Sequence, residues 1–486
     1  MLVAAQQPAA VQQPATAQQH PAQQTTVAAT PPMGWNSWDA YGLTITEPQF
    51  RANAAVLRDK LLPFGWNYAV IDEGWFFENP TARPTPDNLR YAIDPNGRYV
   101  PVPTRFPSAV APSSPAPADS PASATHQLSA TIQSTSFAAL GTWVHAQGLK
   151  FGIHIVRGIP RAAVERNLPI EASSFHAQDA ADTTDACPWD PPNWGVRNNA
   201  AGQAWYDSLL RQYASWGVDL LKVDCIADHP FKLDEIEMIH RAIQKTGRPI
   251  VLSLSPGPTS LKHAAEVEKY AQIWRISDDH WDVWATKKKA DGSSAGPMGT
   301  RDAFDLLAAW FPYVNPGNFA DADMLPFGWL GPEPGYGDAR QSRETHDEQR
   351  SEYTLWAIAR SPLILGANLT RLDDFTRSLI TNQTILFMNQ NITYSHPVDA
   401  ASLPAGSENI RVWRGTIDSP GARGYTEFFA FFNLDDKPVT LRATWQQLGF
   451  DGKHKALDAW TDATTKESKD ITVTLPAHGS TVYEIR

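Results

Sequence analysis

The sequence has few cysteines, no long apolar run and no excess of positive charge. Cys187 and Cys225 are the only two cysteines among 486 residues, which excludes a disulfide-rich scaffold and a cysteine-based zinc cluster. These two thiols either pair or stay free. No run of 18 apolar residues is present, so no membrane-spanning helix is expected. The formal net charge of -11 disfavours nucleic acid and anionic membrane surfaces as partners, because both would repel the chain.

Two segments have the composition of chain outside a packed core. Residues 1–30 are rich in Ala, Gln, Pro and Thr and carry no charged side chain, which predicts a disordered lead. This lead lacks the basic region and the apolar region that a complete signal peptide has. Its start, Met-Leu-Val-Ala-Ala, resembles the end of such a signal, so we expect an exported protein, periplasmic or secreted. The Pro/Ala/Ser-rich stretch at 107–124 predicts a surface insertion in a loop.

Short apolar runs alternate with helical segments between residues 31 and 390. Most of these runs turn polar at their carboxyl ends, which is typical of strands buried on both faces that lead into functional loops. The eight runs span residues 33–38, 68–73, 150–156, 219–225, 249–255, 273–279, 319–325 and 362–368. Eight strands separated by helices predict an α/β fold, a (β/α)8 TIM barrel. A doubly wound open sheet is the alternative, but no glycine-rich nucleotide loop follows the first run.

Helix boundaries and a second domain are also visible. Thr46, with Pro48 and Gln49 after it, predicts a capped helix start. An apolar stripe from Leu233 to Ile243, followed by Gly247, predicts a second helix and its end. From residue 391 to 486 the chain changes to short alternating runs between turn residues. This segment predicts a C-terminal antiparallel β-sandwich that packs against the barrel.

Acidic residues are frequent at the carboxyl ends of the predicted strands, where a barrel gathers its active site. The polar residues at these ends are Asp72, Glu73, His154, Lys222, Asp224, Ser253, Ser255, Arg275, Asp278, Asp279, Asp321 and Asp323. Glycoside cleavage needs two carboxyl groups, one that attacks the sugar and one that is kept protonated for the leaving group. A magnesium or calcium site is disfavoured, because Lys222 and Arg275 would repel the cation. We therefore expect no metal and no cofactor.

Five motifs in order resemble the family-27 glycoside hydrolases, the melibiase-type α-galactosidases. The motifs are PPMGWNSW, IDEGW, LKVDC, WRISDDHWDVW and DADML, spread over residues 31–390, and GIHIVRGIPR at 152–161 is similar to bacterial members. The resemblance implies a retaining exo-hydrolase that releases terminal α-D-galactosyl residues through a covalent glycosyl-aspartate. Its expected substrates are galactoside or galactose-like oligosaccharides and polysaccharide side chains.

The resemblance also implies a role for individual residues. It places the nucleophile on Asp224 and the acid/base on Asp279, with Asp278 as the alternative register for the acid/base. A Cys187–Cys225 bridge is one further implication. Substrate contacts are implied at Trp38, Asp72, Glu73, His154, Lys222, Ser255 and Arg275.

Several positions depart from the family pattern. Glu73 stands where the family usually has an aspartate that reaches the sugar's 6-hydroxyl, and its extra methylene favours a pentopyranose, as in a β-L-arabinopyranosidase. The small Ser255 leaves an α-N-acetylgalactosaminidase as a further alternative, and His154 replaces a common tyrosine. A catalytically silent carbohydrate-binding protein is the remaining alternative. Such a protein is expected to lose Asp224 or Asp279, and both are present.

Overall fold

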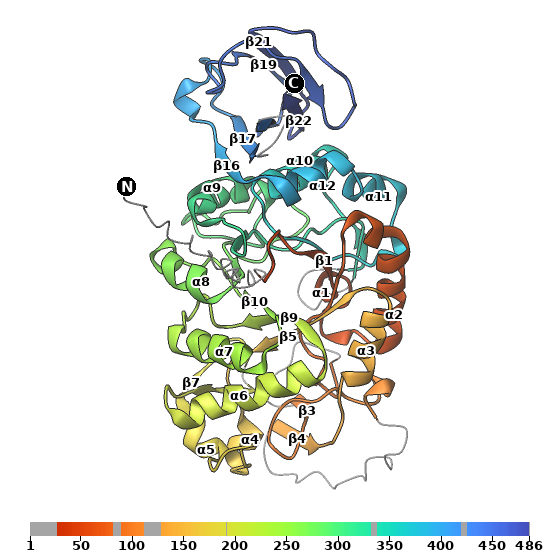
Figure 1. Ribbon diagram of the computed structural model, residues 1–486, viewed down its shortest axis with the longest axis vertical. Helices are drawn as coiled ribbons and strands as arrows, with labels where there is room; N and C mark the ends of the chain where they lie inside the picture. Colours follow the sequence, from red (N-terminus) through yellow and green to blue (C-terminus); the bar gives the residue numbers. More distant parts are fainter. Residues whose placement is uncertain are drawn as a thin grey trace, which may run out of the picture.

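A computed structural model describes residues 27–80, 89–110, 128–190, 192–331, 338–418 and 425–485. A barrel with surrounding helices forms one part of the molecule, and the C-terminal β domain lies at one end of it (Figure 1). Residues 1–26 of the predicted lead and 111–124 of the predicted insertion lie outside the described residues. Val27 and Ala28, which fall within the predicted lead, pack against buried apolar side chains of the barrel strands.

All eight predicted barrel strands are present and parallel. They are β1 (Met33–Asn36), β2 (Tyr68–Ile71), β5 (Lys150–Val156), β9 (Val218–Asp224), β10 (Val251–Leu254), β11 (Ile273–Arg275), β12 (Phe319–Asp321) and β15 (Leu363–Leu365). The order around the sheet is β12-β11-β10-β9-β5-β2-β1-β15. A parallel bridge between Leu325 and Leu365 joins the segment after β12 to β15 and brings the two edges of the sheet together. The predicted α/β barrel is therefore confirmed.

Helices cover the outside of the barrel, and the two predicted helix boundaries are found. In the first, the Thr46 amide donates to Gln49 Oε1 at 2.9 Å, and the apolar side chains of Phe50 and Leu57 that follow are fully buried. In the second, Gly247 ends the helix in the left-handed region with φ 68°. The helices are α1 (Trp38–Tyr41), α2 (Glu47–Val56), α3 (Ala138–Ala146), α6 (Ala200–Ser215), α7 (Leu233–Thr246), α8 (Ala264–Tyr270), α9 (Thr300–Trp310), α10 (His346–Ile358), α11 (Asp374–Ile380) and α12 (Gln383–Asn391).

Small excursions between barrel elements were not predicted. After β5 the chain forms α4 (Arg161–Glu165), α5 (Ala177–Ala180) and an antiparallel sheet of β6 (Ile159–Pro160), β7 (Ala181–Ala186) and β8 (Asn193–Val196). Other short pairs are β3 (Leu89–Ile93) with β4 (Leu128–Ile132), and β13 (Trp329–Leu330) with β14 (Arg340–Gln341). Cys187, directly after β7, forms a disulfide with Cys225 across a Cα–Cα distance of 6.0 Å. The implied bridge is therefore present.

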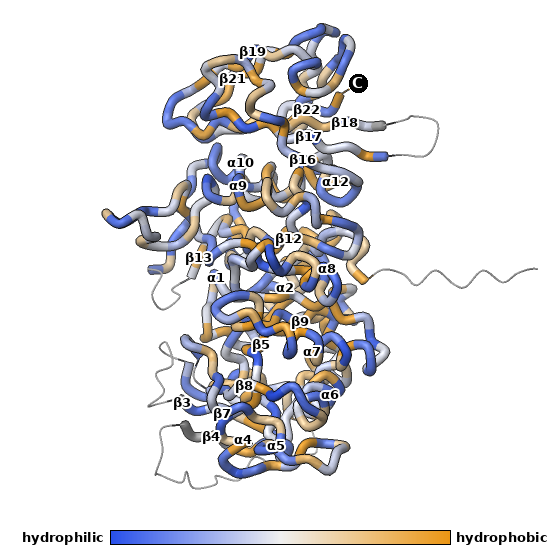
Figure 2. Tube along the Cα trace, turned by 90° about the vertical axis from the view of Figure 1, so that its left-hand side faces the viewer, coloured by the Kyte–Doolittle hydropathy of each residue, from blue (hydrophilic) through white to orange (hydrophobic). Residues whose placement is uncertain are grey.

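The C-terminal domain is antiparallel, as predicted. One sheet has the order β16-β17-β18-β22-β20, and β19 pairs with β21. The strands are β16 (Tyr394–Pro397), β17 (Ile410–Asp418), β18 (Tyr425–Asn433), β19 (Val439–Thr444), β20 (Ala456–Asp458), β21 (Asp470–Leu475) and β22 (Ser480–Ile485). The side view shows this domain beyond helices α9, α10 and α12 (Figure 2). No helix in the described part of the chain is long and apolar enough to cross a membrane.

Candidate active site

The carboxyl ends of the barrel strands surround a pocket with about 400 Å³ of empty space. Its lining residues are Trp38, Asp39, Asp72, Glu73, Lys222, Asp224, Ser255, Arg275, Asp279, His280, Trp281, Asp323 and Met324. Both expected catalytic aspartates and all the expected substrate contacts except His154 are in this set. The residues come from six of the barrel strands or the segments that follow them, so closure of the barrel is what brings them together.

Asp224, the last residue of β9, is held by two donors. The amide of Cys225 donates to Oδ1 at 2.6 Å, and His154 Nε2 lies 3.4 Å from Oδ2. Only 18% of the Asp224 side chain is exposed. Burial alone would raise the pKa of this carboxyl, but the His154 hydrogen bond, the charges of His154 and Lys222 and the Cys225 amide outweigh burial and lower it. Asp224 is therefore kept ionised, as a nucleophile must be.

His154 lies beneath the pocket and does not line it. Its side chain is 1% exposed, and its own backbone carbonyl accepts from Trp75 Nε1 at 2.8 Å. Burial opposes a charge on the imidazole, but the Asp72 and Asp224 carboxylates outweigh it and raise the His154 pKa. The structure therefore places His154 against the nucleophile, where it positions Asp224 and stabilises its charge.

Asp72 and Lys222 form a buried ion pair beside the nucleophile. Lys222 Nζ lies 3.0 Å from Asp72 Oδ2, and Asn36 Nδ2 donates to the same oxygen at 2.6 Å. Burial disfavours both charges, but Lys222 and His154 lower the pKa of Asp72, while Asp72 and Asp224 raise the pKa of Lys222. The pair presents a fixed carboxylate and a fixed ammonium to the pocket, which suits the binding of sugar hydroxyls.

Asp279 lines the pocket from the loop after β11, in a different setting. Half of its side chain, 51%, is exposed, and Arg275 Nη2 lies 3.3 Å from its Oδ1. Limited solvation raises the Asp279 pKa, Arg275 opposes the rise, and the negative charges of Asp323 and Asp224 add to it. Asp278, the alternative acid/base, is exposed and is not among the described residues that line the pocket. The geometry therefore favours Asp279.

Asp323 was noted at a strand end, but the sequence suggested no role for it. Its carboxylate binds Arg275 Nη2 at 2.8 Å and accepts from the His280 amide at 2.8 Å. The Asp323 carbonyl accepts from Trp356 Nε1 at 2.9 Å, and the residue has a left-handed φ of 89°. A non-glycine residue with this φ is uncommon. Asp323 therefore holds Arg275, which in turn contacts the acid/base.

Asp39 also lines the pocket without having been predicted. It follows Trp38 in the short helix α1, directly after β1, and is almost fully buried. Burial, together with the charge of Asp323, raises its pKa well above the ordinary value, although Lys222 opposes this. Gly366 packs so closely that a Cβ at this position would collide with the Asp39 carboxyl group. The sequence carried no signal for Asp39 beyond its place next to Trp38.

Glu73 lies beside Asp72 in the pocket wall, at the position where the sequence departs from the family. Burial raises its pKa, and the carboxyl of Asp190 adds to the rise. Asp190 is itself buried, and burial and the Asp224 charge raise its pKa too. Two carboxyl groups in one buried region cannot both stay ionised at low cost, so the pair retains a proton.

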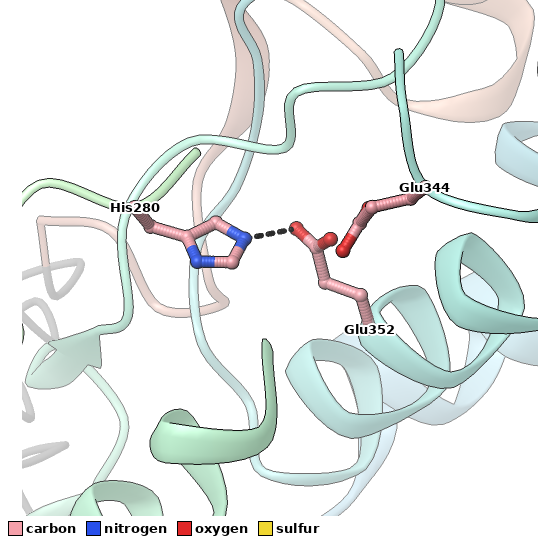
Figure 3. A group of neighbouring side chains, drawn as sticks. All are labelled: His280, Glu344 and Glu352. Atoms are coloured by element: carbon pink, nitrogen blue, oxygen red, sulfur yellow. Dashed lines mark ion pairs between the residues drawn. The ribbon is translucent and has the colours of Figure 1, made fainter. Parts of the chain in front are cut away.

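A third group of titratable residues lies behind the acid/base side. His280, Glu344 and Glu352 are the described residues whose candidate metal-ligand atoms all lie within 4.8 Å of one another (Figure 3). His280 Nε2 is 3.1 Å from Glu352 Oε1, and the Thr300 hydroxyl donates to Glu344 Oε1 at 2.8 Å. Burial raises the pKa of Glu352 to about 8. These contacts hold the His280 ring in the pocket wall, next to Asp279.

Two family models match the chain. One, described as alpha galactosidase A, covers residues 199–391, and the other, the alpha galactosidase C-terminal beta sandwich domain, covers residues 407–485. Among curated proteins, alpha-galactosidase 3 of Arabidopsis thaliana is 25% identical, over 94% of this chain and 82% of its own length.

Solved structures give a closer likeness. A family-27 β-L-arabinopyranosidase from Geobacillus stearothermophilus, in complex with arabinose, is 36% identical with a TM-score of 0.81, covering 94% of this chain and 97% of that one. A protein from Bacillus halodurans, named as a candidate α-N-acetylgalactosaminidase, is 33% identical with a TM-score of 0.75. It covers 94% of this chain and 96% of its own.

Proposed function

Since the chain belongs to glycoside hydrolase family 27, the melibiase-type α-galactosidase family, it is a glycoside hydrolase, and we propose that it releases terminal α-D-galactosyl residues with retention of configuration. One observation carries the proposal. The pocket holds two aspartates whose pKa values are shifted in opposite directions, Asp224 downward and Asp279 upward. When two carboxyl groups in one site have pKa values shifted apart in this way, the ionised group can act as the nucleophile and the protonated group as the proton donor.

The reaction that we propose has two steps. The Asp224 carboxylate attacks the anomeric carbon while the Asp279 carboxyl gives its proton to the glycosidic oxygen, so the leaving group departs as an alcohol. Asp279, now ionised, then takes a proton from water, and this water displaces Asp224 from the sugar. The Arg275 contact with Asp279, at 3.3 Å, stabilises the carboxylate that the first step creates.

The remaining pocket residues support recognition of a galacto-configured ring. The Asp72–Lys222 pair offers one acceptor and one donor that are already oriented, so hydroxyl groups bind without a large ordering cost. Trp38 offers an apolar face for the C–H groups of the sugar. Ser255, also in the pocket wall, adds a small polar contact.

A second candidate activity is hydrolysis of β-L-arabinopyranosides, and Glu73 favours it. Its carboxyl lies in the wall beside Asp72, where a shorter aspartate would leave room for a hydroxymethyl group. β-L-Arabinopyranose has the galacto arrangement of hydroxyls without that group. The similarity to the Geobacillus arabinopyranosidase supports the same alternative.

One assay separates the two activities. The values of kcat/KM for 4-nitrophenyl α-D-galactopyranoside and 4-nitrophenyl β-L-arabinopyranoside are compared in the wild type, Glu73→Asp and Asp224→Asn. We expect Glu73→Asp to shift the ratio toward the galactoside by about 10- to 200-fold, the range that one methylene gives in a pocket. An unchanged ratio removes Glu73 as a specificity residue. Full activity in Asp224→Asn overturns the proposed mechanism.

We also propose that the protein is exported. The Cys187–Cys225 disulfide supports this, because structural disulfides persist mainly in oxidising compartments. Alkylation of protein from its native host without reduction, followed by mass spectrometry, is expected to leave both cysteines unmodified. Modification of both contradicts the proposal.

A further inference from the structure

Trp189 differs from every other tryptophan of the protein in its exposure. All 18 tryptophans lie in the described residues, and Trp189 alone is exposed, with 47% of its surface accessible. The other 17 are buried or partly buried. Exposure alone does not mark a binding residue, since Phe387 is exposed to a similar degree, and what distinguishes Trp189 is its position relative to the active site.

The disulfide fixes Trp189 close to the nucleophile. Trp189 is two residues from Cys187, whose Cα lies 6.0 Å from that of Cys225, and Cys225 directly follows Asp224. The Cα atoms of Trp189 and Asp224 are therefore at most about 17 Å apart. A mobile loop would not keep an aromatic ring in place, whereas this loop is covalently tied to the residue next to the catalytic carboxylate.

The neighbouring Asp190 shows which way the loop faces. Its side chain is 3% exposed, whereas Trp189 and Pro188 before it are exposed. The charge of Asp224 acts on the Asp190 carboxyl, and the charge of Asp190 acts on Glu73 in the pocket wall, which is consistent with an inward position of Asp190 beside the pocket. The loop therefore turns one residue in toward the site and leaves the indole outside it.

We propose that Trp189 is the platform of an aglycone subsite, on which the leaving-group sugar of the substrate stacks. This rests on the proposed function, since an exo-acting enzyme encloses the terminal sugar and leaves the rest of the substrate outside the pocket. One face of a pyranose ring carries mainly C–H groups, which pack against the flat face of an indole. The ligand class is thus a hexose or pentose joined to the terminal sugar. Trp189 would bind this sugar on the leaving-group side of the glycosidic bond that is cut.

The test compares substrates that do and do not reach Trp189. Melibiose carries a glucose leaving group, whereas α-D-galactosyl fluoride has a leaving group too small to touch the loop; the corresponding β-L-arabinopyranosyl pair serves if that sugar is preferred. We expect Trp189→Ala to lower kcat/KM for the disaccharide by about 3- to 10-fold and to leave the fluoride unchanged. Trp189→Phe should recover part of the loss. Phe387→Ala, which removes a 49% exposed aromatic on α12, is the matched control and should change neither substrate.

The outcomes separate the two proposals. If Trp189→Ala leaves the disaccharide unchanged, or lowers both substrates equally while its melting temperature matches the wild type, the aglycone subsite is wrong and the proposed function stands. If the wild type hydrolyses neither glycosyl fluoride, the proposed function is wrong, and the aglycone subsite, which depends on it, is wrong as well. If Asp224→Asn abolishes hydrolysis of both substrates and Trp189→Ala affects only the disaccharide, both proposals are supported.

Discussion

The two sides of the active-site pocket use the same residue type in opposite settings. On the β9 side, Asp224 is 18% exposed, accepts from His154 and the Cys225 amide, and has a lowered pKa. On the β11 side, Asp279 is 51% exposed, contacts Arg275 at 3.3 Å, and has a raised pKa. The difference shows that donors directed at a carboxylate decide its charge more than burial does. The less exposed aspartate is the ionised one, because the His154 hydrogen bond, the charges of His154 and Lys222 and the Cys225 amide together outweigh its burial.

The largest expected effect is on the nucleophile side. Asp224→Asn removes the attacking oxygen charge, so we expect kcat to fall by at least about 10⁴-fold for every substrate. The measurement is steady-state hydrolysis of an aryl glycoside. Asp278→Asn is the matched control, because Asp278 lies near the same site outside the pocket lining, and it should stay within a few-fold of wild type.

The acid/base side should respond according to the leaving group. Asp279→Ala removes the proton donor, so we expect a loss of about 10²- to 10⁴-fold for alkyl or sugar leaving groups. A 2,4-dinitrophenyl leaving group departs without a proton and should lose far less in the first step. Rates with a series of leaving groups of rising pKa check this. A loss that does not depend on the leaving group would contradict the assignment of Asp279.

The pH profile tests the cause of the pKa difference. Activity needs ionised Asp224 and protonated Asp279, so the acid limb should lie below, and the alkaline limb above, the ordinary aspartate value of 3.8. In His154→Asn the positive charge beside Asp224 is lost, and we expect the acid limb to move up by about one pH unit or more. The alkaline limb should stay in place. Movement of both limbs together would show that His154 does not act on Asp224 alone.

The smallest effect is expected for the cluster of His280, Glu344 and Glu352 behind Asp279, where the change is in stability and not in the rate of hydrolysis. Glu352 has a folded-state pKa of about 8 against an ordinary 4.5. Between these values the folded protein keeps a proton that the unfolded chain has lost, so this group's stabilisation falls as pH rises from 4.5 to 8, by at most about 1.4 kcal/mol per pH unit. Glu352→Gln cannot titrate, and its unfolding free energy should fall less over this window. Urea unfolding at pH 5 and pH 8 measures the difference; equal pH dependence in both proteins would contradict it.

Much of the fold could be predicted because local pattern and final environment agree. All eight barrel strands fall in the predicted apolar runs, and the helix starting after Thr46 has the predicted cap. The antiparallel excursion of β6, β7 and β8 could not be predicted, because β6 and β8 are only two and four residues long and the longest strand, β7, is polar and shows no alternation of apolar residues.

The candidate site could be predicted only where a motif marked it. Asp224, Asp279, Asp72 and Lys222 were expected at the site from strand ends and family motifs, whereas the ion pair between Asp72 and Lys222 was not predicted. Asp39 and the His280 cluster were missed, because their neighbours in space are far away in the sequence: His280 meets Glu352 from α10. His154 was expected to contact the substrate, but in the structure its ring supports the nucleophile from below.

The sequence by itself determined the barrel, the C-terminal β domain and the family, because strand periodicity and motif order are properties of the chain read in one direction. Tertiary structure decided which of two adjacent aspartates lines the pocket, whether Cys187 and Cys225 pair, and which of 18 tryptophans stays in solvent. These outcomes depend on how strands that are distant in the sequence close into a barrel. They also depend on which charged and aromatic side chains the closed barrel brings close together. The pKa values of Asp224 and Asp279 belong to the same class, since each is set by donors and charges that only the closed barrel assembles.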